Sequence, residues 1–183
     1  MIKRTPDMKH HITLLVAALC MVACSRQSGH WDTLMQVDSF IEQHPDSALT
    51  VLQRIDATKF KSNKERAKHS LLLSMAMDKN YIDRTDFEVL QPAIDYYETH
   101  GTATDKLRTL YYKGRIYQNR GEKDLAMQVF IKARKPGGEI TDTLTYANLL
   151  VAQGTYLYRQ TSSSRTIYRQ PSYIKPSAAP TTT

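Results

Sequence analysis

The side chains that most often carry catalysis are present in this sequence, but they are not spaced for it. No two of the histidines after residue 24 stand at the spacing of a metal-binding pair: His30, His44, His69 and His100. Asp95 and Glu98 could share one helix face, where solvated charge is the usual role of such a pair. The chain contains no GxGxxG, GxxxxGKS/T, HExxH or GxSxG motif. We therefore expect no enzymatic activity, no metal and no cofactor.

One predicted helix carries a cluster of basic and aromatic residues. Its members are Arg108, Tyr111, Tyr112, Lys113, Arg115, Tyr117 and Arg120. Arg108 and Arg115 are seven residues apart, which places them on one stripe of a helix with Tyr111 and Tyr112 beside it. Such a stripe can bind a peptide that is acidic or ends in a free carboxylate, through charge-assisted hydrogen bonds. These four are our candidate partner-binding residues; a single-stranded nucleic acid site and a purely structural face are the alternatives.

The amino terminus has the organisation of a bacterial lipoprotein precursor. Three basic residues precede an apolar segment over 12–23, which is shorter than the about 20 residues of a membrane span. Met21, Val22, Ala23 and Cys24 resemble a lipobox, which implies removal of residues 1–23 and a diacylglycerol on Cys24. Several acyl chains on one residue make a stable anchor. The alternative is an uncleaved or buried apolar start.

This anchor implies a location in the cell envelope. Residues 24–30 form a short linker without an acidic residue, so we expect the protein to face the periplasm rather than the cell surface. A partner protein or peptide is then expected, and nucleic acid is not. The formal net charge of +7 permits attraction to nucleic acid without predicting it.

Apolar residues recur at helical spacing from Trp31 onward, and no segment alternates like a strand. We expect helices over 31–44, 45–55, 63–77, 85–101, 104–120, 123–134 and 142–159. Thr85 and Glu88 fit a capping box, and Pro92 predicts a bend or a later start in that helix. The prediction is an all-α domain of helical hairpins over 31–159.

The segment 107–140 resembles a tetratricopeptide (TPR) repeat, a 34-residue helix–turn–helix unit. Its matching positions are Leu110, Gly114, Tyr117, Gly121, Ala126, Phe130 and Ala133. In that repeat, small residues such as Gly114 and Ala126 stand where the two helices approach closely, and Gly121 makes the turn. The resemblance implies a short right-handed solenoid.

The stretch from Leu34 to Ala133 also resembles a family of Gram-negative TPR lipoproteins. The pieces that carry this resemblance are PDSALTVLQRI, residues 45–55, and DKNYID, residues 78–83. It implies a scaffold or regulatory protein that binds other proteins and performs no chemistry. The alternative is a glycan- or nutrient-binding lipoprotein built on similar helices, although the single tryptophan, Trp31, lies beside the anchor.

Residues 160–183 are rich in Ser, Thr and Pro and contain no acidic residue, which predicts a disordered tail. Two interpretations stay open: a natural tail, or a truncated or frame-shifted member of a longer repeat protein. Truncation would leave the last predicted helix, residues 142–159, with an uncovered apolar face, because repeat arrays need a polar terminal cap.

Overall fold

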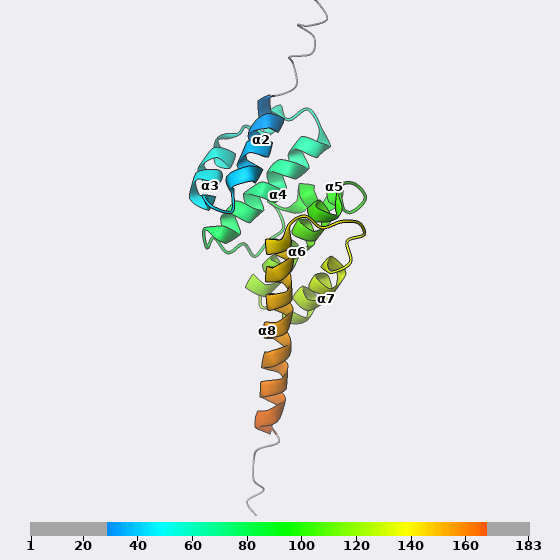
Figure 1. The fold of residues 1–183 in the computed structure, drawn as a ribbon. Coiled ribbons are helices and arrows are strands. Elements are labelled where there is room, and N and C mark those ends of the chain that lie inside the picture. The colour runs from blue at the N-terminus through cyan, green and yellow to red at the C-terminus, as the bar shows by residue number, and fades with distance from the viewer. Residues whose placement is uncertain (1–28, 168–183) are drawn as a thin grey trace, which may run out of the picture. The chain divides into compact units, whose positions relative to one another are not determined.

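The computed structural model describes residues 29–167, with side chains over 30–162, and this part of the chain is helical (Figure 1). It contains seven α-helices, one short 3-10 helix and no strand among those residues, which confirms the all-α prediction. The predicted signal peptide and the lipidation residue Cys24 lie outside the described residues. The predicted domain over 31–159 divides into two compact units, which meet in sequence at Gly101 and Thr102.

The first unit is built around α4 (Asn63–Lys79). Three helices pack against it: α2 (Gly29–Phe40), α3 (Pro45–Arg54) and α5 (Gln91–Tyr97). The 3-10 helix η1 (Ala57–Lys59) joins α3 to α4. Because α4 has neighbours on several sides, its burial is not confined to one stripe, and Leu71, Leu72, Met75 and Ala76 are all fully buried.

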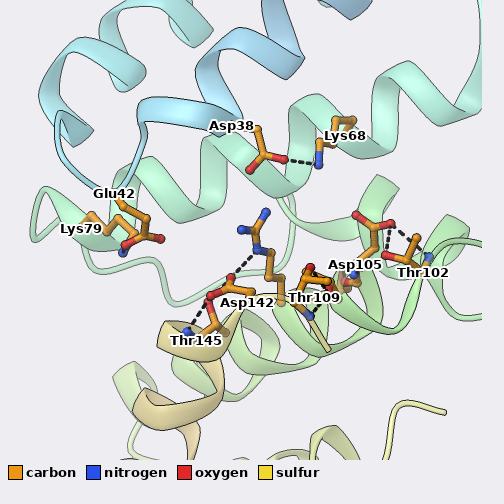
Figure 2. A network of polar contacts seen from close by, with 12 residues as sticks. Asp38, Glu42, Lys68, Lys79, Thr102, Asp105, Thr109, Asp142 and Thr145 are labelled. Atoms are coloured by element: carbon orange, nitrogen blue, oxygen red, sulfur yellow. Dashed lines mark hydrogen bonds and ion pairs between the residues drawn. The ribbon is translucent and has the colours of Figure 1, made fainter. Parts of the chain in front are cut away.

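Two ion pairs join α4 to the chain of α2 and the turn after it (Figure 2). Lys68 Nζ lies 2.7 Å from Asp38 Oδ2, and Lys79 Nζ lies 2.6 Å from Glu42 Oε2. Lys68 is almost fully buried, a position that lysine takes when a carboxylate compensates its charge. These pairs therefore hold α2 in register along the central helix.

The helix predicted from Thr85 begins later than its capping box suggested. Asp86, and not Thr85, accepts the hydrogen bond of Glu88 N at 3.0 Å, and α5 starts only at Gln91. Pro92 then falls in the first turn, where its missing N–H costs no helical hydrogen bond. The predicted start at Thr85 is wrong, whereas the alternative of a later start at Pro92 is correct.

The second unit consists of α6 (Ala103–Asn119), α7 (Lys123–Ala133) and α8 (Thr143–Ile167), and each helix packs against the other two. Thr102 and Asp105 form a reciprocal capping box at the start of α6. Gly121 has φ of +80°, the left-handed conformation that lets the chain turn directly from α6 into α7.

Helix α8 extends beyond the predicted boundary at 159. The backbone is helical through Ile167, so the prediction of disorder is wrong for 160–167. Thr161 Oγ1 donates to Leu157 O at 3.2 Å and Ser162 Oγ donates to Tyr158 O at 3.0 Å, so these hydroxyls bond to the preceding turn instead of breaking the helix. Residues 168–183 of the predicted tail lie outside the described part of the chain.

Within residues 29–167, no helix combines the length and apolar character that a membrane crossing requires.

Candidate functional site

The four candidate partner-binding residues do not form one exposed stripe. Tyr111 and Tyr112 are only 8% and 3% exposed, and their rings meet edge to face at 5.1 Å. The Tyr111 ring also lies 5.9 Å from the ring of Phe130 on α7. The two tyrosines are therefore core residues, and the prediction that they flank an open binding stripe is wrong for both.

Arg108 takes part in a structural ion pair with the beginning of α8. Its Nε donates to Asp142 Oδ2, while Thr145 donates to both carboxylate oxygens through its backbone N–H and its hydroxyl (Figure 2). Burial by itself would raise the pKa of Asp142, but the hydrogen bonds from Thr145 and Arg108 outweigh burial and lower it. Arg108 thus contributes to the packing of α6 on α8, and the prediction that it grips a ligand is not supported by this geometry.

Arg115 is the one member of the predicted stripe that faces an open cavity. The cavity has a volume of about 600 Å³ and lies within the second unit, among α6, α7 and α8. Three lining residues are cationic: Arg115, Lys123 and Arg159. The polar remainder is Gln118, Asn119, Thr155, Tyr156 and Gln160, and the apolar floor is Ala126, Met127, Phe130 and Ala152.

The lining contains no carboxylate, and the Asp124 carboxylate contacts one lining residue, Tyr156. Tyr156 donates its hydroxyl to Asp124 Oδ1, a bond that raises the pKa of the tyrosine. Gln160 Nε2 donates to the same hydroxyl at 2.7 Å. Asp124 therefore fixes the Tyr156 ring at the edge of the cavity, while the cavity itself presents cations, amides and an apolar floor.

The floor depends on the residues that resembled a TPR repeat. Gly114 has no side chain, and the Phe130 ring occupies the space that a side chain would need. Ala126, Phe130 and Ala133 are buried, whereas Leu110 and Tyr117 are half-buried. The sequence predicted that α6 and α7 approach closely at Gly114 and Ala126. In the structure the close contact is between Gly114 on α6 and the Phe130 ring on α7.

Sequence reasoning overlooked Lys123 and Arg159 because it searched one helix at a time. These residues lie on α7 and α8, 36 positions apart, and only the packing of the three helices brings both to the lining with Arg115. One signal was available: Ala152, Tyr156, Arg159 and Gln160 recur at helical spacing along one side of α8.

A second cavity, in the first unit, is less suited to an anion. Its volume is about 680 Å³, and its cationic residues are Arg66 and Arg84. Arg84 pairs with Asp86 and Glu88, and Arg66 donates to Asn63 and to Phe60 O. Glu88 itself is part of the lining. This cavity therefore combines charges of both signs.

His69 lies at that second cavity as a packed side chain. Its Nε2 is 3.0 Å from Leu52 O, and since a carbonyl can only accept, Nε2 carries the hydrogen. Burial lowers the pKa of His69 more than this hydrogen bond raises it. Within the described residues, no cluster of His, Cys, Asp and Glu could hold a metal ion.

Comparison of the chain with protein-family models, curated proteins and solved structures found no match. The cavity of the second unit and the sequence motifs are therefore the features from which a function can be inferred.

Proposed function

We propose that this chain is a lipid-anchored helical interaction module of the bacterial cell envelope, and that it binds a protein or peptide partner in the cavity of its second unit. One observation carries the proposal: Arg115, Lys123 and Arg159 line the cavity together with amide side chains and an apolar floor, and the only recorded carboxylate contact with these lining residues is that of Asp124 with Tyr156 at the edge. An anionic, partly apolar ligand suits this lining. A peptide with acidic side chains or a free carboxyl end has both properties.

The TPR-like arrangement supports this proposal without being required for it. The hairpin of α6 and α7 turns at Gly121 and packs through Gly114 and Phe130. Both α6 and α7 contact α8, which follows as the next helix of such an array would. We propose that these helices form part of a TPR-like array whose concave side is the cavity.

The charge of the lining determines how binding should respond to salt. Lys123 and Arg159 are exposed, so their attraction to an anion is screened by dissolved ions. Contacts with the apolar floor are not screened by salt, so residual binding should remain at high ionic strength. A glycan ligand would favour exposed aromatic platforms, and of the two aromatic residues in the lining Phe130 is buried and only Tyr156 is partly exposed.

The test is a titration of the full chain, in a nonionic detergent, with two fluorescent peptides of equal length. One ends in two glutamates with a free carboxylate, and the other ends in two glutamines with an amide. We expect the acidic peptide to bind at least about tenfold more tightly, because each charge-assisted contact contributes about 1.5–3 kcal/mol before screening.

Charge reversal locates the site. Lys123→Glu and Arg159→Glu should each weaken the acidic peptide about tenfold or more. The matched control is Lys132→Glu, which makes the same change at an exposed position of α7 outside the lining. Equal affinity for both peptides, or equal loss in the control, would contradict the proposed site.

A further inference from the structure

Helix α8 has an exposed apolar side, opposite the cavity. Thr145, Leu149 and Gln153 are buried at a spacing of four residues, which marks the side of α8 that packs on α6 and α7. Large apolar residues stay exposed on the other side: Leu144, Leu150, Val151, Leu157 and Tyr158, with exposed fractions of 41–74%. We call these five, with Ala147 and Gly154 between them, the outer face of α8.

We propose that the outer face of α8 is a self-association surface, on which a second copy of this chain docks its own α8 in a two-fold dimer. This inference goes beyond the proposed peptide binding and does not depend on it. The cavity lies on the other side of α8, so a dimer leaves it open.

The order of residues along the outer face suits a pair of helices. Ala147 and Gly154 are seven residues apart, and so are Leu150 and Leu157. Small and large residues thus alternate with the heptad spacing of paired helices. A Cβ on Gly154 would meet no atom within 4 Å, so the helix surface there is open to a close neighbour.

The same spacing of a glycine between two large residues occurs on α6, where the glycine contacts a neighbouring helix. On α6, Leu110, Gly114 and Tyr117 have the same spacing as Leu150, Gly154 and Leu157 on α8. Gly114 receives the Phe130 ring of α7, whereas Gly154 has no corresponding neighbour. Leucine side chains of a second α8 can fill the space over Gly154 in the same way.

Charge favours a second copy over a strongly charged partner. From Thr143 to Tyr158, α8 contains no charged residue. In a two-fold dimer the same surface of each copy faces the other, so a charge on that surface would lie near its own like charge and repel it. The uncharged outer face avoids this repulsion, and it contrasts with the cationic lining on the cavity side.

The area also meets the requirement of a small dimer. With about 200 Å² for a fully exposed large side chain, the five residues offer roughly 500 Å² on each copy. Two copies would bury about 1,000 Å², which is near the lower limit of specific interfaces. We therefore expect a concentration-dependent dimer.

The experiment is sedimentation velocity of the full chain in density-matched nonionic detergent, over a hundredfold range of concentration. Wild type should shift from monomer to dimer. Leu150→Glu/Leu157→Glu should stay monomeric. The control Asn148→Glu/Thr155→Glu places the same charges at the same spacing outside the outer face, at exposed positions of which Thr155 lines the cavity, and should still dimerise.

A second variant keeps the test decisive if the glutamates unfold the helix. Gly154→Leu adds a side chain where the monomer has open space, so the fold should persist while the dimer dissociation constant rises at least about tenfold. Circular dichroism verifies helicity in each variant.

Four results would overturn the dimer. They are a wild type that is monomeric throughout, equal loss in both glutamate pairs, an unchanged dimer in Gly154→Leu, and a dimer that persists in Leu150→Glu/Leu157→Glu. The last would assign association to another segment. A monomer that binds phosphatidylcholine vesicles only with an intact outer face would assign that face to lipid. Acidic-peptide binding is measured separately, so its failure leaves this result unaffected.

Discussion

The ring of Phe130 occupies the space beside Gly114 where any other residue would place its Cβ. A Cβ built on Gly114 would lie 2.6 Å from Cδ1 and 2.8 Å from Cζ of that ring. Such distances are far inside van der Waals contact, so α6 and α7 can approach this closely only because position 114 is glycine.

Gly114→Ala is therefore expected to destabilise the second unit by about 1–3 kcal/mol through overpacking. Gly154→Ala is the matched control on α8, where the added methyl meets open space. It should stabilise by about 0.5–1 kcal/mol, since alanine loses less backbone entropy than glycine in a helix. The measurement is urea unfolding followed by circular dichroism, with hydrogen exchange of residues 103–159 to identify the unit. The same sign for both changes would contradict the packing at Phe130.

Asp142 should contribute stability that depends on acid. Asp142→Asn leaves Arg108 without its carboxylate in a side chain only 13% exposed, so we expect a loss of about 3 kcal/mol at neutral pH. The pKa of Asp142 is lowered in the folded state. Its stabilisation is therefore complete above the unfolded value near 3.8 and is lost as pH falls through the lower folded value. Wild type and Asp142→Asn should converge below that range, whereas a constant difference would contradict the ion pair.

His69 should make the first unit sensitive to mild acid. Burial holds the folded pKa of His69 below its ordinary value of 6.5, so the unfolded chain takes up the proton first. Stability should be complete above about pH 6.5 and fall as the pH is lowered towards the folded pKa. His69→Gln should remove this dependence, while His44→Gln, at an exposed position, should retain it. The readout is the urea midpoint between pH 7.5 and 5, reported by Trp31 fluorescence. Parallel slopes in all three proteins would show that His69 is not the source.

Acylation of Cys24 remains a prediction from the sequence. Cells that express the full chain and receive an alkyne analogue of palmitate should label wild type and Cys20→Ser, but not Cys24→Ser. The thiol is the attachment site in the lipobox resemblance, and serine lacks it. Cys24→Ser should also retain residues 1–23, which mass spectrometry detects. Labelling of Cys24→Ser at the wild-type level would exclude this anchor.

Helix positions were largely predictable because the features that determine them are local. Pro45 begins α3, and Gly121 makes the turn between α6 and α7. Both residues act through their own backbone conformations. The start of α5 was mispredicted because Thr85 and Glu88 fit a capping box, whereas Asp86 accepts the Glu88 N–H in a turn and α5 begins at Gln91 without a side-chain cap. The end of α8 was missed because a Ser/Thr-rich composition favours disorder on average, whereas Thr161 and Ser162 bond within the helix.

The sequence by itself determined the all-α class and most helix boundaries, because these follow from spacing along one chain, and the resemblance to a TPR repeat implied a small residue at position 114. Only the tertiary structure decided that Tyr111 and Tyr112 are buried and that Arg108 pairs with Asp142. It also brought Lys123 and Arg159 to the lining that Arg115 shares. The physical reason is that a helical period shows which residues share a side of a helix, whereas the neighbours that cover that side come from distant parts of the chain.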